Sequence, residues 1–233
     1  MTKPQVTFNI IGHIQTDFAE KFGIPRQSGL VNTLKATIIF EPEYRNPDAF
    51  KGIEDFSHVW LIWLFSETMR DQWSPTVRPP KLGGNRRKGV FATRSPFRPN
   101  PVGLSCVKLE SFEIDAKYGP VLHVRGADLM DGTPILDIKP YLPYTESHTD
   151  AVGGFADAHI HDRLTVQCPE HLLHRIMPEK QEALLEVLAG DPRPAYHHDS
   201  DRVYGFIFDG MNVQFKVNNQ ILTVQDIQKQ NNQ

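Results

Sequence analysis

The chain has 233 residues, of which 39% are hydrophobic and 23% charged, and its formal net charge is −3. This composition is typical of a globular protein, and the length exceeds that of a usual single domain. No apolar run approaches the roughly 18 residues of a membrane span, and the N-terminus lacks a signal-peptide pattern. The two cysteines, Cys106 and Cys168, stand far apart. We therefore expect a cytoplasmic protein with reduced thiols and no membrane contact.

The N-terminal part of the chain predicts mainly strands. Alternating apolar residues predict strands over Val6–Ile14 and Leu34–Phe40, with a loop at Lys21–Gly29 between them. Asn46–Phe56 predicts a short polar helix or turn. The most apolar run, His58–Phe65, carries two of the three tryptophans. Continuous apolarity over about eight residues predicts a strand buried on both faces.

A proline-rich stretch over residues 88–105 follows. The three prolines within Pro96–Pro101 lack backbone donors and fix φ, so neither a helix nor a central strand passes through them. We expect Val90–Ala92 to end one strand and Val102–Leu109 to open the next. A rigid loop holds polar side chains for recognition at little entropic cost, and here they are Arg94, Arg98 and Asn100. A stiffened surface turn with solvated arginines is the alternative.

This stretch lies inside a basic segment. From Gln72 to Leu109 there are eight basic residues and no Asp or Glu, which leaves a formal −11 for the rest of the chain. Such asymmetry predicts an electropositive face for a polyanion or an anionic cofactor. A Walker-type phosphate loop is excluded because Val90 stands where that motif requires Lys. No Gly-x-Gly dinucleotide fingerprint occurs either.

The middle of the chain predicts a hairpin and a polar turn. Val102–Ile114 and Pro120–Ala127 have the alternation of paired strands, and Asp128–Pro134 has the composition of a turn. Asp137 and Lys139 stand two residues apart in the next predicted strand, so their side chains point to the same side. They form either a surface ion pair or part of a site.

The C-terminal part predicts a small α+β unit after a linker at Glu146–His161. Pro178–Gly190 has the start, the apolar stripe and the glycine end of a helix. Tyr204–Phe208 and Val213–Val217 flank an Asp-Gly turn and predict a hairpin, with Gln220–Val224 as a third strand. Two histidine pairs are candidate zinc ligands, but no cysteine or carboxylate completes a known zinc-site spacing, so we expect no metal. They are His159 with His161 and His171 with His174.

Two motifs resemble the TsaA-like (TrmO) family. They are Lys-Gly-Val-Phe-Ala-Thr-Arg-Ser-Pro-Phe-Arg-Pro-Asn-Pro-Val-Gly-Leu-Ser over 88–105 and Leu-Met-Asp-Gly-Thr-Pro-Ile-Leu-Asp-Ile-Lys-Pro-Tyr over 129–141. The family comprises S-adenosylmethionine-dependent tRNA methyltransferases built on a β-barrel. Its bacterial members methylate N6 of N6-threonylcarbamoyladenosine next to the anticodon, and they are homodimers. The resemblance runs from about Ile10 to Pro143, and Asp191–Tyr196 resembles the second domain of the bacterial branch.

The resemblance implies a mainly β fold with a single-sheet barrel-type domain over 4–145, a linker over 146–161 and an α+β domain over 162–233. It implies a donor site at Arg26, Gln27, Ser66, Glu67, Arg94, Leu104, Asp131, Gly132 and Thr133. Candidates for catalysis are Arg98, Asn100 and Asp137, and candidates for RNA binding are Arg86, Arg87, Lys88 and Lys139. Expected partners are tRNA carrying threonylcarbamoyladenosine and a second copy of the chain. A non-catalytic RNA-binding module and a small-molecule methyltransferase are the alternatives.

Overall fold

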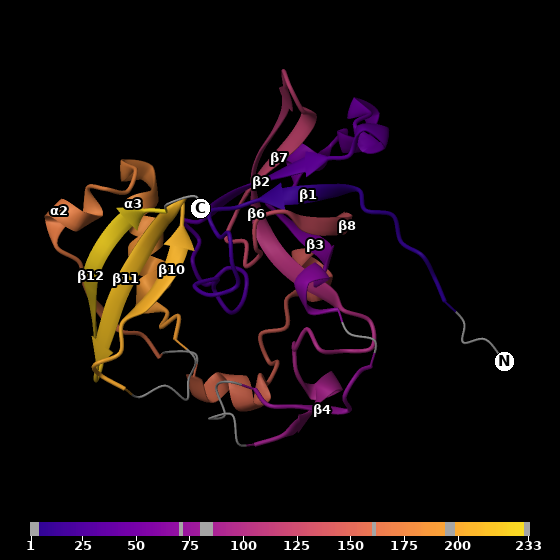
Figure 1. The fold of residues 1–233 in the computed structure, drawn as a ribbon. Coiled ribbons are helices and arrows are strands. Elements are labelled where there is room, and N and C mark those ends of the chain that lie inside the picture. The colour runs from indigo at the N-terminus through magenta and orange to yellow at the C-terminus, as the bar shows by residue number, and fades with distance from the viewer. Residues whose placement is uncertain (1–4, 70–71, 80–85, 160–161, 194–198, 231–233) are drawn as a thin grey trace.

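The computed structural model describes residues 5–69, 72–79, 86–159, 162–193 and 199–230. A closed barrel lies beside a smaller sheet that carries the main helix on one face (Figure 1). The expectation of a mainly β protein with a barrel and a small α+β part is confirmed. Within the described ranges, no helix has both the length and the apolar character needed to cross a bilayer.

The barrel closes in the order β1-β2-β7-β6-β3-β8, and every neighbouring pair is antiparallel. Closure leaves this sheet without an edge strand, which is the usual place for unwanted pairing with other chains. Its strands are β1 (Gly12–Gln15), β2 (Lys35–Phe40), β3 (His58–Leu64), β6 (Val102–Asp115), β7 (Gly119–Arg125) and β8 (Thr133–Pro140).

Alternate residues of each barrel strand point inward. In β3, Val59, Leu61 and Trp63 are buried, whereas the residues between them are half-buried. The expectation that this strand is buried on both faces is therefore wrong, because a closed barrel gives each strand one inner and one outer face. Gly103 on β6 lies opposite Trp63, and a Cβ there would come within 2.2 Å of the indole ring. Glycine makes room for that ring.

Two further expectations about strands are corrected. The first strand covers only Gly12–Gln15, and residues 6–11 are outside it. Val90–Ala92 forms a 3-10 helix instead of a strand end, because pairing stops after the two-residue strand β5 (Lys88–Gly89). The partner of β5 is β4 (Thr76–Val77). Among the described residues of this part, further short 3-10 helices are η1 (Pro42–Tyr44), η2 (Pro47–Phe50), η3 (Ile53–Asp55) and η4 (Ser66–Thr68).

The C-terminal sheet has the order β10-β11-β12-β9, and β9 runs parallel to β12. Its strands are β9 (Thr165–Gln167), β10 (Tyr204–Phe208), β11 (Met211–Asn218) and β12 (Ile221–Lys229). The hairpin turn at Asp209 and Gly210 has positive φ at both residues, as the sequence predicted for an Asp-Gly pair. Strand β9 was not predicted, because three residues are too short for a periodic signal.

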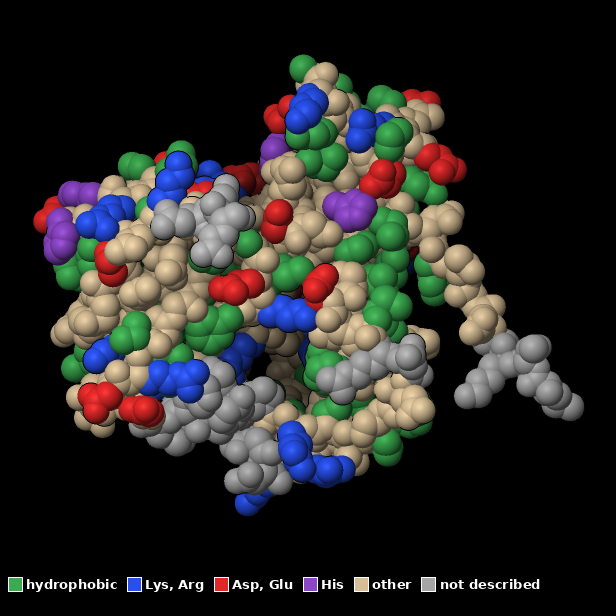
Figure 2. Space-filling view, in the orientation of Figure 1, with side chains coloured by type: hydrophobic (Ala, Val, Ile, Leu, Met, Phe, Trp, Pro, Cys, Tyr) green, Lys and Arg blue, Asp and Glu red, His purple; other side chains and the backbone are tan. Residues whose placement is uncertain are grey.

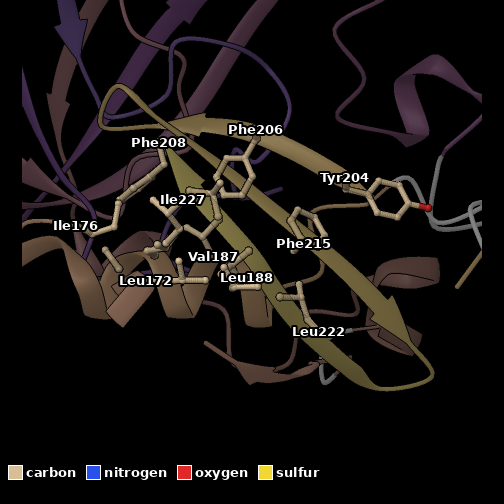
Figure 3. Packing of buried hydrophobic residues seen from close by; sticks show 14 of the residues in the cluster. Leu172, Ile176, Val187, Leu188, Tyr204, Phe206, Phe208, Phe215, Leu222 and Ile227 are labelled. Atoms are coloured by element: carbon tan, nitrogen blue, oxygen red, sulfur yellow. The ribbon is translucent and has the colours of Figure 1, made fainter. Parts of the chain in front are cut away.

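Helix α3 (Pro178–Ala189) covers one face of this sheet, with the short helix α2 (Glu170–Leu173) beside it. Val187 and Leu188 pack toward Phe215 and neighbouring sheet residues (Figure 3). The predicted helix start at Pro178 and end at Gly190 are confirmed. Between the barrel and this unit lie α1 (Pro143–Glu146) and the 3-10 helix η7 (Gly154–His159).

Candidate functional site

The connection between β1 and β2, residues 16–34, runs from the barrel to the C-terminal sheet. Phe18 is buried in the core of that sheet, and its ring makes an edge contact with Phe208 at 5.6 Å between centroids. Gly23 has a φ of 98° and lies against Phe206, so that a Cβ there would approach the ring to 2.3 Å. We call residues 16–34 the bridging loop.

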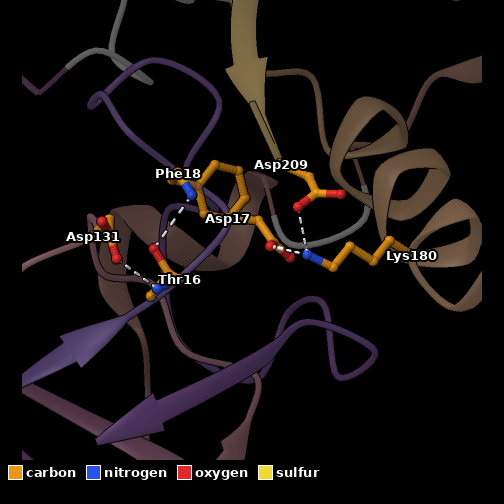
Figure 4. Close-up of polar contacts among 6 residues, drawn as sticks. All are labelled: Thr16, Asp17, Phe18, Asp131, Lys180 and Asp209. Atoms are coloured by element: carbon orange, nitrogen blue, oxygen red, sulfur yellow. Dashed lines mark hydrogen bonds and ion pairs between the residues drawn. The ribbon is translucent and has the colours of Figure 1, made fainter. Parts of the chain in front are cut away.

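An ion-pair network holds the start of the bridging loop (Figure 4). The Lys180 ammonium on α3 lies 2.5 Å from Asp17 and 2.6 Å from Asp209, and the three side chains are 14–27% exposed. The backbone N–H of Asp209 also donates to the Asp17 carbonyl at 2.9 Å. Burial opposes the charge of Lys180, but the hydrogen bonds to the two carboxylates outweigh it and raise the pKa of Lys180.

The residues on either side of Asp17 hold the turn that contains Asp131. The Thr16 N–H donates to an Asp131 carboxylate oxygen at 3.0 Å, and the Asp131 N–H donates to the Phe18 carbonyl at 2.8 Å. Gly132 follows with a φ of 74°, which favours glycine, and the buried Thr133 hydroxyl donates to a carbonyl within the same turn. The predicted turn therefore forms, and the C-terminal unit supports it through the bridging loop.

Further along the bridging loop, Arg26 and Gln27 have different surroundings. The Arg26 guanidinium donates to the carbonyls of Asp191 and Arg193 at 3.3 and 3.0 Å, and burial lowers the pKa of Arg26. Gln27 instead accepts a hydrogen bond from Arg94 at 2.5 Å. The structure thus brings Gln27 and Arg94 into direct contact across 67 positions of sequence, whereas the Arg26 side chain contacts the C-terminal unit.

Sequence reasoning missed a polar chain beside this contact. The Trp63 indole donates to the hydroxyl of Ser105, which is fully buried, and Ser105 donates to Asp128 at 2.5 Å. Burial raises the pKa of Asp128, against hydrogen bonds from Ser105 and the Ser28 backbone and the nearby charge of Arg94. The signal was present: Ser105 is a polar residue at an inward position of a strand, where it needs a buried partner.

The proline-rich loop is braced from within. Arg98 donates to the carbonyl of Thr93 at 3.0 Å and to that of Ser95 at 3.4 Å, so its guanidinium is engaged with its own loop. Asn100 is exposed, and its carbonyl accepts from the Val102 N–H at 2.8 Å at the start of β6. The rigid loop predicted from the prolines is present, with Arg98 as part of its frame.

Leu104 and Asp137 occupy one row on the outer face of the barrel. Both stand directly opposite Ile62, Leu104 on β6 and Asp137 on β8, and residues directly opposite share a face. Leu104 is 50% exposed. Asp137 pairs with Lys139 at 3.0 Å, so the two side chains lie on the same side of the strand, as their spacing predicted.

The remaining predicted residues lie around the bridging loop and the basic segment. Lys21 of the bridging loop donates to the Glu67 carbonyl at 3.0 Å, next to Ser66 in η4. Arg86, Arg87 and Lys88 are exposed, and Arg87 donates to the Thr76 hydroxyl at 3.2 Å. Figure 2 shows Lys and Arg side chains at the lower end of the molecule, where Figure 1 places β4.

Two family models match the chain, one over each of its two parts. Residues 13–147 match the tRNA-methyltransferase O N-terminal domain, and residues 159–230 match the TrmO C-terminal domain. The chain belongs to the TrmO family. The first match contains the barrel and the proline-rich loop, and the second contains α3 and the C-terminal sheet.

Relatives and a solved structure of the TrmO family match between 70% and 98% of this chain. A tRNA (adenine(37)-N6)-methyltransferase of Escherichia coli K12 is 42% identical over 90% of this chain and 92% of its own. A protein of the same name from Eikenella corrodens is 48% identical over 70% of this chain and 91% of its own. A crystal structure of TrmO from Pseudomonas aeruginosa superposes with a TM-score of 0.79 at 34% identity, covering 98% of this chain and 99% of the other.

Two cavities adjoin Asp131, one of the residues predicted to bind a donor. One of about 480 Å³ lies between the barrel and α3 and is lined by Asp131 and Lys180, and one of about 220 Å³ is lined by Asp131 and Gly132. Neither is lined by the other predicted donor residues, which are Arg26, Gln27, Ser66, Glu67, Arg94, Leu104 and Thr133. Among the described residues, no group of three or more His, Cys, Asp and Glu side chains could hold a metal. The pair at His159 and His161 lies outside the described side chains.

Proposed function

We propose that this TrmO family member transfers a methyl group from S-adenosylmethionine to N6 of adenosine 37 in tRNA. The match to the Escherichia coli tRNA (adenine(37)-N6)-methyltransferase carries this proposal, because it extends over 90% of this chain and 92% of that one. A relative from Pseudomonas aeruginosa, named as an S-adenosylmethionine-dependent methyltransferase, is 43% identical over 84% of this chain and supports the choice of donor.

The proposed acceptor is N6-threonylcarbamoyladenosine, the modified nucleoside next to the anticodon, as the TsaA-like motifs imply. We further propose that the protein is cytoplasmic and forms a homodimer, and that its barrel domain over 4–145 catalyses methyl transfer. In the proposed domain organisation, a linker over 146–161 and a C-terminal domain over 162–233 follow the barrel domain.

The donor site is assigned to the residues around the bridging loop, and their chemistry fits S-adenosylmethionine. The exposed Asp131 carboxylate offers a partner for the donor's ammonium or ribose hydroxyls, and Arg94 offers a guanidinium for its carboxylate. The cavity of about 480 Å³ beside Asp131 falls within the usual range for small-molecule sites. Arg26, Gln27, Ser66, Glu67, Leu104, Gly132 and Thr133 complete the assigned set.

When bound, S-adenosylmethionine supplies a methyl carbon made electrophilic by its sulfonium sulfur. The residues of this chain then act chiefly by aligning the acceptor nitrogen with that carbon. A nitrogen bonded to a carbamoyl carbon is a poor nucleophile, so removal of its proton helps. Asp137 is assigned that role because it is partly exposed in the same row as Leu104. Lys139, 3.0 Å from the Asp137 carboxylate, is assigned to contact the RNA. Asn100 and the loop braced by Arg98 are assigned to position the acceptor.

The test uses purified protein, S-adenosylmethionine and two tRNA preparations, one with and one without the threonylcarbamoyl group. We expect N6-methylated threonylcarbamoyladenosine by mass spectrometry with the first and no product with the second. Donor binding without methylation of either tRNA would favour a small-molecule methyltransferase. RNA binding with no donor binding would favour a non-catalytic module.

Measurements of donor affinity and of turnover distinguish the proposed roles of Asp131 and Asp137. Asp131→Asn keeps the size but removes the charge, so we expect donor affinity to fall about tenfold or more, as loss of a hydrogen bond to a charged group costs. Asp137→Asn should lower turnover and leave donor affinity unchanged. Equal donor affinity in the Asp131 variant would remove that residue from the site.

A further inference from the structure

Two large aromatic side chains stand exposed beside the paired strands β4 and β5. Trp73 is 51% exposed and Phe91 is 74% exposed. Their ring centroids lie 6.2 Å apart, with the ring planes inclined by 32°. Aromatic rings stabilise a fold most when buried, so two neighbouring rings left in water indicate a surface that a ligand covers.

The pairing of β4 with β5 holds these rings together. The Val90 N–H donates to the Pro75 carbonyl at 3.0 Å, at the end of the pairing between Thr76 and Gly89. Trp73 and Phe91 flank this hydrogen bond, one on each chain segment, so the rings are presented by a paired scaffold.

The surroundings of the two rings are basic. Arg86, Arg87 and Lys88 are exposed on the adjoining residues, and the segment from Gln72 to Leu109 contains no Asp or Glu. Single-stranded nucleic acid presents a charged backbone together with stackable bases, and proteins bind it with cationic side chains beside aromatic ones. The exposed basic side chains and the exposed aromatic rings therefore both indicate single-stranded nucleic acid as the ligand.

We propose that Trp73 and Phe91 form a stacking platform for an unpaired base of the tRNA anticodon loop. Arg86 and Arg87 contact the phosphates beside that base. The inference rests on the proposed function and adds to it a subsite for a nucleotide near the acceptor adenosine.

The experiment measures binding of an anticodon stem-loop RNA to Trp73→Ala, Phe91→Ala and the double variant. Loss of a base stack typically weakens binding about 5- to 150-fold, which we expect for each single variant. The dependence of binding on salt should keep the wild-type slope, because no phosphate contact is lost. Trp73→Phe keeps a ring and should retain most of the affinity.

Ile114→Ala is the matched control, because Ile114 is 59% exposed and lies one residue before the end of β6. The hairpin of β6 and β7 extends away from β4 (Figure 1). Unchanged RNA affinity in the double variant would overturn the platform. So would conversion of a dimer to a monomer, which would make a second copy of the chain the occupant. Methylation by the wild type is measured alongside, so that a failure of the proposed function is seen separately.

Discussion

The ammonium of Lys180 lies 2.5 Å from the carboxylate of Asp17, and this contact joins α3 to the residues that hold Asp131. The C-terminal unit thus supports the residues that hold Asp131, and α3 also lines one side of the cavity of about 480 Å³ beside them. Asp209 completes the arrangement at 2.6 Å, so one cation serves two carboxylates. Removing the cation would leave two negative charges close together in a partly buried place.

Lys180→Met should therefore destabilise the protein and weaken donor binding. We expect a loss of about 1–3 kcal/mol in the free energy of unfolding, below the 3–5 kcal/mol typical of a fully buried pair. Urea unfolding measures the first effect and calorimetric titration with S-adenosylmethionine the second. Lys180→Arg should restore both the stability and the donor affinity, and Lys216→Met on β11, in the sheet that α3 covers, serves as a control. Wild-type donor affinity in folded Lys180→Met would separate the ion pair from the donor site.

The buried Asp128 should impose a pH dependence on stability. Burial raises its pKa above the ordinary 3.8, so the folded state holds the proton more tightly than the unfolded state does. Stability from this group is thus present at low pH and falls as pH rises from about 4 through the raised pKa. Asp128→Asn cannot ionise and should lack this fall. Thermal unfolding of the wild type and of Asp128→Asn between pH 4 and 8 measures this difference. Parallel plots of the unfolding temperature against pH for the two proteins would contradict the prediction for Asp128.

Gly103→Ala should disrupt the barrel wall. Its new Cβ would lie 2.2 Å from the Trp63 ring, which itself is held by the hydrogen bond to Ser105. We expect a loss of about 1–3 kcal/mol in the free energy of unfolding, the usual cost of overpacking a core. Gly89→Ala has open space around its Cβ and should change the unfolding free energy by less than about 0.5 kcal/mol. Equal unfolding midpoints for the two variants would show that the ring moves aside freely.

Neutralising Arg86, Arg87 and Lys88 together should weaken tRNA binding and flatten its salt dependence. Each lost phosphate contact should lower the log–log slope by about 0.7–0.9. Donor affinity should barely change, because these residues lie outside the braced loop of Arg94–Pro101. Binding at several salt concentrations provides the measurement. A wild-type slope in the triple variant would place the phosphate contacts elsewhere.

Local sequence determined much of this protein. The prolines at 96, 99 and 101 dictate a rigid loop, because the proline ring fixes φ. The Asp-Gly pair at 209 and 210 favours a tight turn, because glycine adopts positive φ without steric cost and Asp tolerates it. Helix α3 follows from its proline start, apolar stripe and glycine end. Spacing alone also predicted that Asp137 and Lys139 lie on the same side of their strand. The motifs indicated the family.

Only the tertiary structure decided which distant residues meet. Closure of the barrel gave β3 an inner and an outer face, which its apolar sequence could not reveal. Packing of Phe18 under the C-terminal sheet brought Asp17 to Lys180, a contact across 163 positions that no local pattern encodes. The partners of Arg26 and Ser105 depend likewise on how the chain closes on itself. A buried polar group requires a partner, but the fold chooses which one it finds.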